Sequence, residues 1–301
     1  MADIANWLAS AQAWIEAELE RALSRSLATA PPRLAEAVRY PLLGGGKRLR
    51  PALALTCCEL VLEKAGSPTT RARELALPAA LGLEALHTYS LVHDDLPCMD
   101  DDDLRRGRPT VHKAYGEATA VLVGDALQAL AFEWVAHGPR AAEAVRVLAR
   151  AAGARGMVGG QALDLASSEP GAAVDLAAVR AIHGLKTAAL IEAACELGAL
   201  AAGARERERR VARAYGRALG LCFQAVDDCL DVTGDAATLG KTPGKDQRLE
   251  RGTLVAVAGL EGARVEAALR AAEALGALEG WDGGAARSLR EVVAFVLQRS
   301  R

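Results

Sequence analysis

Apolar residues recur at helical spacing along nearly the whole chain, in segments that proline and glycine separate. These segments cover about 3–28, 33–43, 50–65, 72–97, 111–136, 140–158, 175–202, 206–233, 253–276 and 283–299. Although 51% of the residues are hydrophobic, only 4% are aromatic, and alanine and leucine dominate, which favours packed helices over sheets. We therefore expect an all-α protein. Because no composition shift marks a boundary, we expect residues 1–301 to form a single domain.

Charge, the N-terminal residues and the cysteines limit the class of protein. The 36 Lys+Arg and 38 Asp+Glu residues leave a net charge of -2, which argues against nucleic acid as a partner. The first residues lack the basic and apolar regions of a signal peptide, and no run reaches the roughly 18 uncharged apolar residues of a spanning helix. The six cysteines form no CxxC pair and have mostly apolar neighbours, which predicts buried free thiols. We expect a soluble cytoplasmic protein without stable membrane insertion.

Two aspartate clusters lie far apart in the chain, each within an otherwise apolar helical segment. They are DDLPCMD at residues 94–100 and DDCLD at residues 227–231. Carboxylates that face one spot repel each other unless a cation lies between them, and oxygen ligands select Mg²⁺ or Mn²⁺. Because magnesium also prefers phosphate oxygens, the two clusters predict a metal site for a diphosphate substrate.

The spacing within each cluster indicates which carboxylates can act together. Asp227 and Asp231 are four residues apart and share one helix face, whereas Asp228 points aside. On a straight helix, Asp100 would lie about 240° around from Asp94. The proline between these two residues cannot continue a helix, so we expect the helix to bend or end and Asp100 to fold back toward Asp94.

The aspartates could instead form a solvated acidic surface or a calcium loop. An acidic surface suffices for residues 101–103, but the leading aspartates of both clusters follow core-like apolar segments, where unpaired carboxylates are costly. A calcium loop that began at Asp100 would need glycine at its sixth place and glutamate at its twelfth. The chain has Arg105 and Val111 there, so a calcium loop is excluded.

Basic residues are available to hold a diphosphate. The glycine-rich turn GGGKRLRP, residues 44–51, brings Lys47, Arg48 and Arg50 to a predicted helix start, where free N–H groups favour an anion. Further cations come from other segments: Arg105, Arg106, Lys186, Lys241 and Lys245. Each alone is more simply a surface charge. The long aperiodic segment 234–252 and the C-terminal QRSR are candidates for closing a site.

Taken together and in this order, these motifs resemble the trans-isoprenyl diphosphate synthases, the polyprenyl synthetase family. The resemblance runs from GGGKRLRP through HTYSLVHDDLPCMDDDDLRRGRPTVH, GMVGGQALDL, HGLKTAAL and FQAVDDCLDVTGD to LGKTPGKDQ. It implies an isoprenoid synthase fold of about ten helices around a central cavity, a homodimer, and elongation of an allylic diphosphate by isopentenyl diphosphate. It also implies Mg²⁺ as the cofactor, about three ions per site, with Mn²⁺ as a substitute.

Carried over onto the matching positions, the resemblance assigns roles to individual residues. The implied metal ligands are Asp94, Asp95, Asp100, Asp227 and Asp231. The residues that match the allylic diphosphate site are Arg105, Lys186, Thr187, Gln224 and Lys241. Those that match the isopentenyl diphosphate site are Lys47, Arg50, His87 and Arg106. The catalytic set is then Asp94, Asp95, Asp100, Asp227, Asp228, Lys186 and Lys241. Without the resemblance, His87 would more simply be a hydrogen-bonded core histidine, and Gln224 a buried amide bonded to backbone.

The expected product length depends on the residues below the first cluster. Tyr89 lies five residues before Asp94, roughly 7.5 Å along a helix, with Ser90 beside it, and a ring there could form the floor of an apolar tunnel. This aromatic residue and the two extra residues within DDLPCMD resemble the corresponding positions of bacterial farnesyl diphosphate synthases. The sequence LPCMD itself resembles that of plant-type geranylgeranyl synthases. We expect farnesyl diphosphate as product, with geranylgeranyl diphosphate as the alternative. Core packing alone would also account for Tyr89.

Two departures and two rival functions accompany the resemblance. Arg251 stands where the family usually has lysine, and Ala188 stands where it usually has glycine. A class I terpene cyclase would share the metal site but has no use for a second diphosphate pocket around Lys47, Arg50 and Arg106. A non-catalytic partner subunit of a heteromeric synthase would usually have lost one aspartate motif, and both are intact here.

Overall fold

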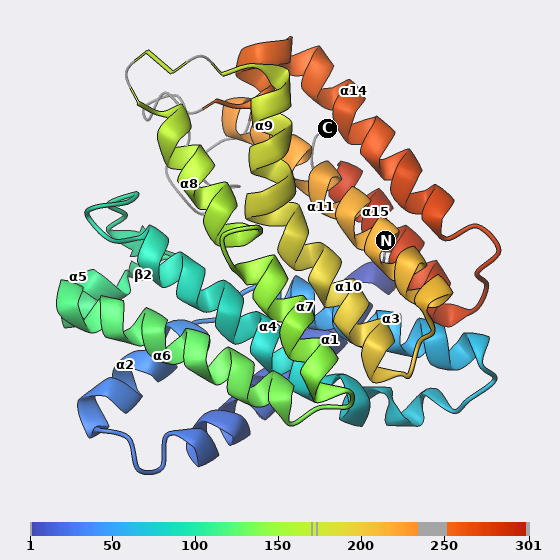
Figure 1. Cartoon of the computed structure of the whole chain (residues 1–301), viewed down its shortest axis with the longest axis horizontal. Coiled ribbons are helices and arrows are strands. Elements are labelled where there is room, and N and C mark those ends of the chain that lie inside the picture. The colour runs from blue at the N-terminus through green and yellow to red at the C-terminus, as the bar shows by residue number, and fades with distance from the viewer. Residues whose placement is uncertain (1, 170, 173, 234–251, 299–301) are drawn as a thin grey trace.

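Long helices make up almost all of the regular structure, as the periodicity predicted (Figure 1). The computed structural model describes residues 2–169, 171–172, 174–233 and 252–298. The N-terminal part contains α1 (Ala2–Ser26), α2 (Pro32–Leu42), α3 (Leu49–Lys64), the 3-10 turn η1 (Thr69–Arg71) and α4 (Ala72–Asp94). A two-stranded antiparallel hairpin follows, β1 (Leu104–Arg105) and β2 (Arg108–Pro109), and then α5 (Val111–Tyr115), α6 (Glu117–Ala136), α7 (Ala141–Ala152) and α8 (Met157–Ser167).

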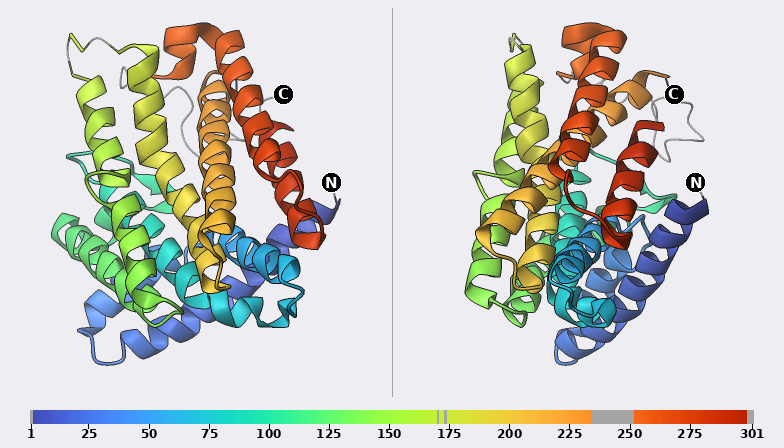
Figure 2. Two further views of the ribbon diagram at one scale, coloured as in Figure 1. Left: turned by 45° about the vertical axis from the view of Figure 1, so that its right-hand side comes forward. Right: turned by 90° about the vertical axis from the view of Figure 1, so that its right-hand side faces the viewer.

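The C-terminal part contains α9 (Leu176–Ile182), the π-helix η2 (His183–Ala188), α10 (Ala189–Ala201), α11 (Glu206–Thr233), α14 (Leu254–Ala277) and α15 (Gly284–Gln298). In Figure 2, the continuous column of α9, η2 and α10 lies between α8 and α11, and α11 lies beside α14; the N-terminal helices, drawn in blue, lie together in the lower part of the molecule. The all-α fold expected from the sequence is confirmed.

Small residues let these helices approach closely. A Cβ added at Gly198 on α10 would lie 2.0 Å from the carbonyl oxygen of Ala54 on α3, so the two backbones are in direct contact there. The core around these contacts is mainly alanine, leucine and valine, with few aromatic side chains. An alanine-rich composition therefore supports both helix formation and the close packing of the helices around the site.

Several predicted boundaries were wrong, each for a local reason. The predicted helix 111–136 is divided at Gly116, whose φ of 89° no helix accommodates. The predicted segment 140–158 ends at Ala152, and α8 begins as a separate helix at Met157. The hairpin at residues 104–109 was not expected, because strands of two residues are too short to show any periodicity.

All six cysteines are free, and five are buried as expected, but Cys98 is exposed.

Two described helical segments, Thr69–Asp94 and Glu117–Ala136, are long and apolar enough to cross a membrane by length and composition. In the first, 67% of the most apolar window is buried inside the protein, as in the core helix of a soluble protein. In the second, α6, the buried share is 44%, because Val121 and Leu122 lie on an outward face with exposures of 42% and 56%. The exposed apolar face of α6 thus remains available for contact with another surface.

Candidate active site

A cavity of about 410 Å³ opens between α4, α8 and η2. Its polar lining residues are Arg50, His87, Ser90, His93, Asp94, Gln161, Lys186 and Thr187. Its remaining wall consists of Tyr89, Leu91, Met99, Met157, Val158, Ala162 and Leu165. Charged groups and a largely apolar wall therefore share one half-open cavity, which suits a ligand with an anionic head and a hydrocarbon tail.

The first aspartate cluster lies at the end of α4. The helix ends at Asp94, and the backbone N–H of Asp100 donates a 2.8 Å hydrogen bond to the carbonyl oxygen of Asp94. The expected fold-back of Asp100 is thus confirmed. Burial, and then repulsion from Asp100 and Asp95, raises the pKa of Asp94 to about 6 although Lys186 opposes the shift. A cation placed among these carboxylates would relieve that repulsion.

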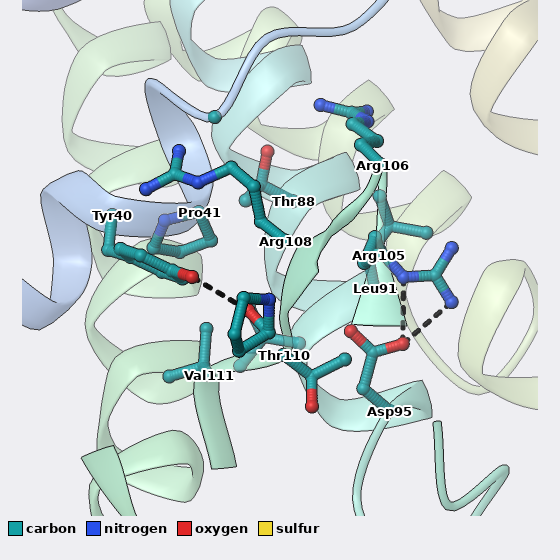
Figure 3. A pocket seen from close by; sticks show the side chains of 13 residues that line it. Tyr40, Pro41, Thr88, Leu91, Asp95, Arg105, Arg106, Arg108, Thr110 and Val111 are labelled. Atoms are coloured by element: carbon teal, nitrogen blue, oxygen red, sulfur yellow. Dashed lines mark hydrogen bonds and ion pairs between the residues drawn. The ribbon is translucent and has the colours of Figure 1, made fainter. Parts of the chain in front are cut away.

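Asp95 is engaged by the hairpin. The Arg105 guanidinium donates from Nε to Asp95 Oδ1 at 2.7 Å, and its Nη2 lies 2.6 Å from the same oxygen (Figure 3). The hairpin is itself anchored by Tyr40, whose hydroxyl donates to the carbonyl oxygen of Pro109 at 2.8 Å and whose ring lies beneath the Arg108 guanidinium. In this structure Asp95 and Arg105, predicted to contact metal and diphosphate respectively, bind each other.

The π-helix η2 brings Lys186 and Thr187 to the cavity. Lys186 Nζ lies 2.5 Å from Asp164 Oδ2 on α8. Thr187 Oγ1 donates to Gln224 Oε1 on α11 at 2.7 Å. A Cβ added at Gly160 of α8 would lie 2.1 Å from the backbone nitrogen of Lys186, so only glycine permits this approach of the two helices. The position of Lys186 and Thr187 therefore depends on contacts from α8 and α11.

Of the second aspartate cluster, Asp228 borders a smaller cavity of about 60 Å³, which shares Lys186 and Thr187 with the 410 Å³ cavity. Gln224 Nε2 donates to Asp228 Oδ1 at 3.2 Å, and Asp228 Oδ2 accepts from the backbone N–H of Leu254 at 2.7 Å. Asp228, predicted to point aside, thus holds the start of α14. Asp231 is buried, with 7% exposed, and its Oδ1 has no hydrogen-bond partner among the described residues.

The carboxylates fit a divalent cation, although the described ranges contain no preassembled group of three or more metal-binding side chains. Two observations support the fit. The pKa of Asp94 is raised, chiefly by burial, and an oxygen of Asp231 is buried without a hydrogen-bond partner in the part of the chain that the structure describes. Both groups would gain from a positive charge. Because the donors are carboxylates, the ion that they suit is Mg²⁺ or Mn²⁺.

The predicted isopentenyl diphosphate residues divide between three places. Arg50 and His87 line the 410 Å³ cavity, and burial lowers the pKa of Arg50 to about 10. Burial and the surrounding arginines hold the pKa of His87 well below its usual range, so His87 is neutral near pH 7. Arg106 contacts the glycine-rich turn and donates to the carbonyl oxygen of Gly45. Lys47 is exposed and borders a different small cavity, beside aromatic residues of α1, α11 and α15.

Several predicted positions lie outside the described residues. These are Lys241, Lys245, Arg251, nearly all of the candidate lid 234–252, and the last three residues of the C-terminal QRSR. Ala188, the other departure, is the last residue of η2 and is buried.

Sequence reasoning gave no role to two α8 residues that belong to the site. Asp164 pairs with Lys186, and Gln161 borders the cavity with both amide atoms buried and unpartnered among the described residues. Their positions in GGQALDL, three residues apart on one helix face, were the available signal.

Comparisons with known proteins decide the family. The sequence model of the Polyprenyl synthetase family matches residues 31–281. The chain belongs to this family. It is 48% identical over 277 residues to geranylgeranyl pyrophosphate synthase 9, chloroplastic, of Arabidopsis thaliana, which covers 89% of this chain and 75% of that protein. It is 44% identical over 278 residues to heterodimeric geranylgeranyl pyrophosphate synthase large subunit 1, chloroplastic, of the same plant, covering 89% and 73%.

A solved structure supports the same family assignment. The FPP/GFPP synthase from Zymomonas mobilis is 38% identical and superposes with a TM-score of 0.83, covering 98% of this polyprenyl synthetase and 100% of that chain. The isoprenoid synthase fold and prenyltransferase chain elongation, both implied by the motifs, are thereby confirmed for this polyprenyl synthetase. The family's substrates are isopentenyl diphosphate and allylic diphosphates.

Proposed function

We propose that this polyprenyl synthetase is a Mg²⁺-dependent prenyltransferase that condenses isopentenyl diphosphate with an allylic diphosphate. The single observation that carries the proposal is the half-open cavity of about 410 Å³, which Asp94 and Lys186 line together with Arg50, His87 and a largely apolar wall. Such a lining suits two diphosphates whose hydrocarbon parts must meet away from water.

The carboxylates that would hold the metal are Asp94 and Asp100 on one side and Asp227 and Asp231 on the other. Asp95, whose Oδ1 accepts from Arg105, could join them through its other oxygen. When bound, Mg²⁺ would neutralise the negative charge that develops on the leaving diphosphate. Asp228 has its own hydrogen bonds to Leu254 and Gln224, which supports a structural role; its place in the catalytic set stays a prediction.

The chain's own residues would bind both substrates and stabilise the charge that forms. The Lys186 ammonium, held by Asp164, would favour departure of the allylic diphosphate because it attracts the leaving group most strongly in the transition state. Arg50 and Arg106 would bind isopentenyl diphosphate, with neutral His87 beside it as a hydrogen-bond donor. The double bond of isopentenyl diphosphate then attacks the allylic cation, and the departed diphosphate accepts the proton that is lost. The roles of Lys47 and Lys241 stay predictions.

We propose geranylgeranyl diphosphate, with twenty carbons, as the product. The sequence alone favoured farnesyl diphosphate, but the relatives at 48% and 44% identity are both named geranylgeranyl pyrophosphate synthases, which favours the longer product. Farnesyl diphosphate remains the second candidate because one observation supports it: Tyr89 is almost fully buried and lines the cavity. The name of the Zymomonas mobilis enzyme, an FPP/GFPP synthase, gives a second reason to keep farnesyl diphosphate as a candidate.

We also propose a homodimer that forms through the outward face of α6. Val121 and Leu122 are large apolar side chains on this face, and a second copy of the chain would cover them. The heterodimeric name of one relative makes a different partner subunit the alternative. A cytoplasmic location gains no support from these relatives, whose names place them in chloroplasts, and it stays a prediction.

Radiolabelled isopentenyl diphosphate and allylic primers of five, ten and fifteen carbons, with and without Mg²⁺, test the proposal. We expect Mg²⁺-dependent elongation that stops at twenty carbons when the products are separated by chromatography; arrest at fifteen carbons would favour farnesyl diphosphate. Farnesyl diphosphate alone serves as the control for a terpene cyclase, which would release a hydrocarbon. Absence of any elongated product with every primer would contradict the proposed function and favour a non-catalytic partner subunit.

A further inference from the structure

A buried carboxylate, Glu84 of α4, lies one helical turn before His87. Only 2% of Glu84 is exposed, and Arg48 Nη1 donates to Glu84 Oε1 at 2.6 Å. The Arg48 side chain is itself completely buried. Burying two charges costs free energy, and apolar side chains of similar size are often at least as stable in the same place. We therefore expect this ion pair to have a role other than stability.

The pair fixes the glycine-rich turn. Arg48 has a left-handed backbone, with φ of 49° and ψ of 36°, and stands immediately before α3. Its Nη2 donates to the carbonyl oxygen of Leu42 at 2.8 Å, so one guanidinium joins the end of α2 to Glu84 on α4. A left-handed conformation is unfavourable for arginine and persists only where such contacts hold it. Glu84 therefore helps to place the turn that presents Arg50 to the cavity.

Two further arginines gather around the same turn. The Arg106 guanidinium lies against Gly45 and Gly46, and Figure 3 shows it pointing away from the Asp95 that binds its neighbour Arg105. Burial lowers the pKa values of Arg50 and Arg106, and in both cases Glu84 opposes the shift. One carboxylate thus acts on three arginines, of which Arg50 lines the cavity proposed for isopentenyl diphosphate.

We propose that Glu84 is the counter-charge of the isopentenyl diphosphate pocket, a positioning residue that holds Arg48 and limits how tightly the arginines bind diphosphate. This inference rests on the proposed function. Replacing Glu84 with glutamine keeps the side-chain shape and an oxygen that can accept from Arg48, but it removes the negative charge. The positive potential of the pocket rises, and diphosphate binding becomes tighter. A merely structural role predicts the opposite, because a disturbed turn would bind its ligand more weakly.

Isothermal titration of isopentenyl diphosphate into Glu84→Gln, without Mg²⁺ or an allylic primer so that no turnover occurs, tests the inference. We expect the Kd to fall at least about fivefold, while KM for the allylic substrate in the full reaction stays unchanged. The matched control is Glu196→Gln. Glu196 is also buried, at 6% exposed, and also binds arginines, Arg209 at 2.6 Å and Arg213 at 2.8 Å, but it borders a different cavity. This control should leave the Kd unchanged.

A second variant keeps the inference testable if Glu84→Gln does not fold. Glu16 is 40% exposed and lies 3.7 Å from Arg48 Nε, so Glu16→Gln removes a weaker counter-charge from the surface. At low ionic strength its Kd should fall about twofold. An unchanged or higher Kd in either folded variant overturns the inference. If the wild-type protein binds no isopentenyl diphosphate, the proposed function fails as well; if it does and Glu84→Gln matches it, this inference alone fails.

Discussion

Replacing Gly160 with alanine tests whether η2 must lie where it does for the enzyme to work. The added Cβ would lie 2.1 Å from the backbone nitrogen of Lys186 and 2.5 Å from its Cα, whereas ordinary contacts begin at 3.4 Å. Because these are backbone atoms, no side-chain rotation can relieve the clash. The α8 and η2 backbones must therefore separate by about 1 Å, carrying Lys186 and Thr187 away from the cavity.

The size of the effect follows from this displacement. Overpacking of this kind lowers the free energy of unfolding by about 1–3 kcal/mol, which urea unfolding would measure. A misplacement of about 1 Å in positioning groups costs about 100-fold in rate. We therefore expect kcat/KM for the allylic substrate, from initial rates at saturating isopentenyl diphosphate, to fall about 100-fold while the protein remains folded.

Gly276→Ala on α14 is the matched control. An added Cβ there meets no heavy atom within 4 Å, so the variant should keep full activity and gain about 0.5 kcal/mol in stability. If Gly160→Ala retained the wild-type kcat/KM, the idea that catalysis depends on the α8–η2 contact would be refuted.

Three further changes have defined outcomes. Tyr89→Ala should lengthen the tunnel and shift the products toward longer chains on chromatography; an unchanged product distribution would rule out Tyr89 as the floor. Burial, and then repulsion from Glu63, raises the pKa of Glu59 from 4.5 to about 7. Between these two pH values the folded protein keeps a proton on Glu59 that the unfolded chain has lost. The free energy of unfolding therefore falls as the pH rises from 4.5 to about 7. Glu59→Gln should therefore be about 1 kcal/mol more stable than wild type at pH 8, after allowance for solvent screening, and equal to it near pH 4, as urea unfolding at the two pH values would show. Leu122→Glu should convert a dimer to monomers in sedimentation, and a persistent dimer would exclude the α6 face.

Features that depend on neighbouring residues were predictable from the sequence. The apolar segments gave the bounds of α1, α3 and α11 to within a residue or two, because α1 and α11 each bury a stripe of apolar side chains and α3 is apolar and buried on nearly all sides. The fold-back of Asp100 followed from Pro97, because the missing N–H is a covalent property of that residue.

Features that depend on distant partners were not predictable. Glu84 pairs with Arg48 across 36 positions, and Lys186 with Asp164 across 22. The chain offers many other carboxylates and cations for such pairs, and only the packed helices select between them. The π-helix escaped prediction for a related reason. Apart from Gly184, its residues have ordinary helix propensities, and contacts from α8 and α11 bear on its geometry.

The six-residue π-helix His183–Ala188 constrains how this stretch of the chain can change in length. A π-turn closes its hydrogen bonds over one residue more than an α-turn, so loss of a single residue here would restore a regular α-helix. Because a π-turn advances less per residue than an α-turn, six π residues turn about as far as five α residues, so α9 and α10 would keep nearly the same relative orientation while the residues within the segment would change the side they face. A surface loop would tolerate the loss of one residue. In this segment, the same loss would move Lys186 out of position relative to the residues that support it. We therefore expect natural selection to keep the length of the segment constant.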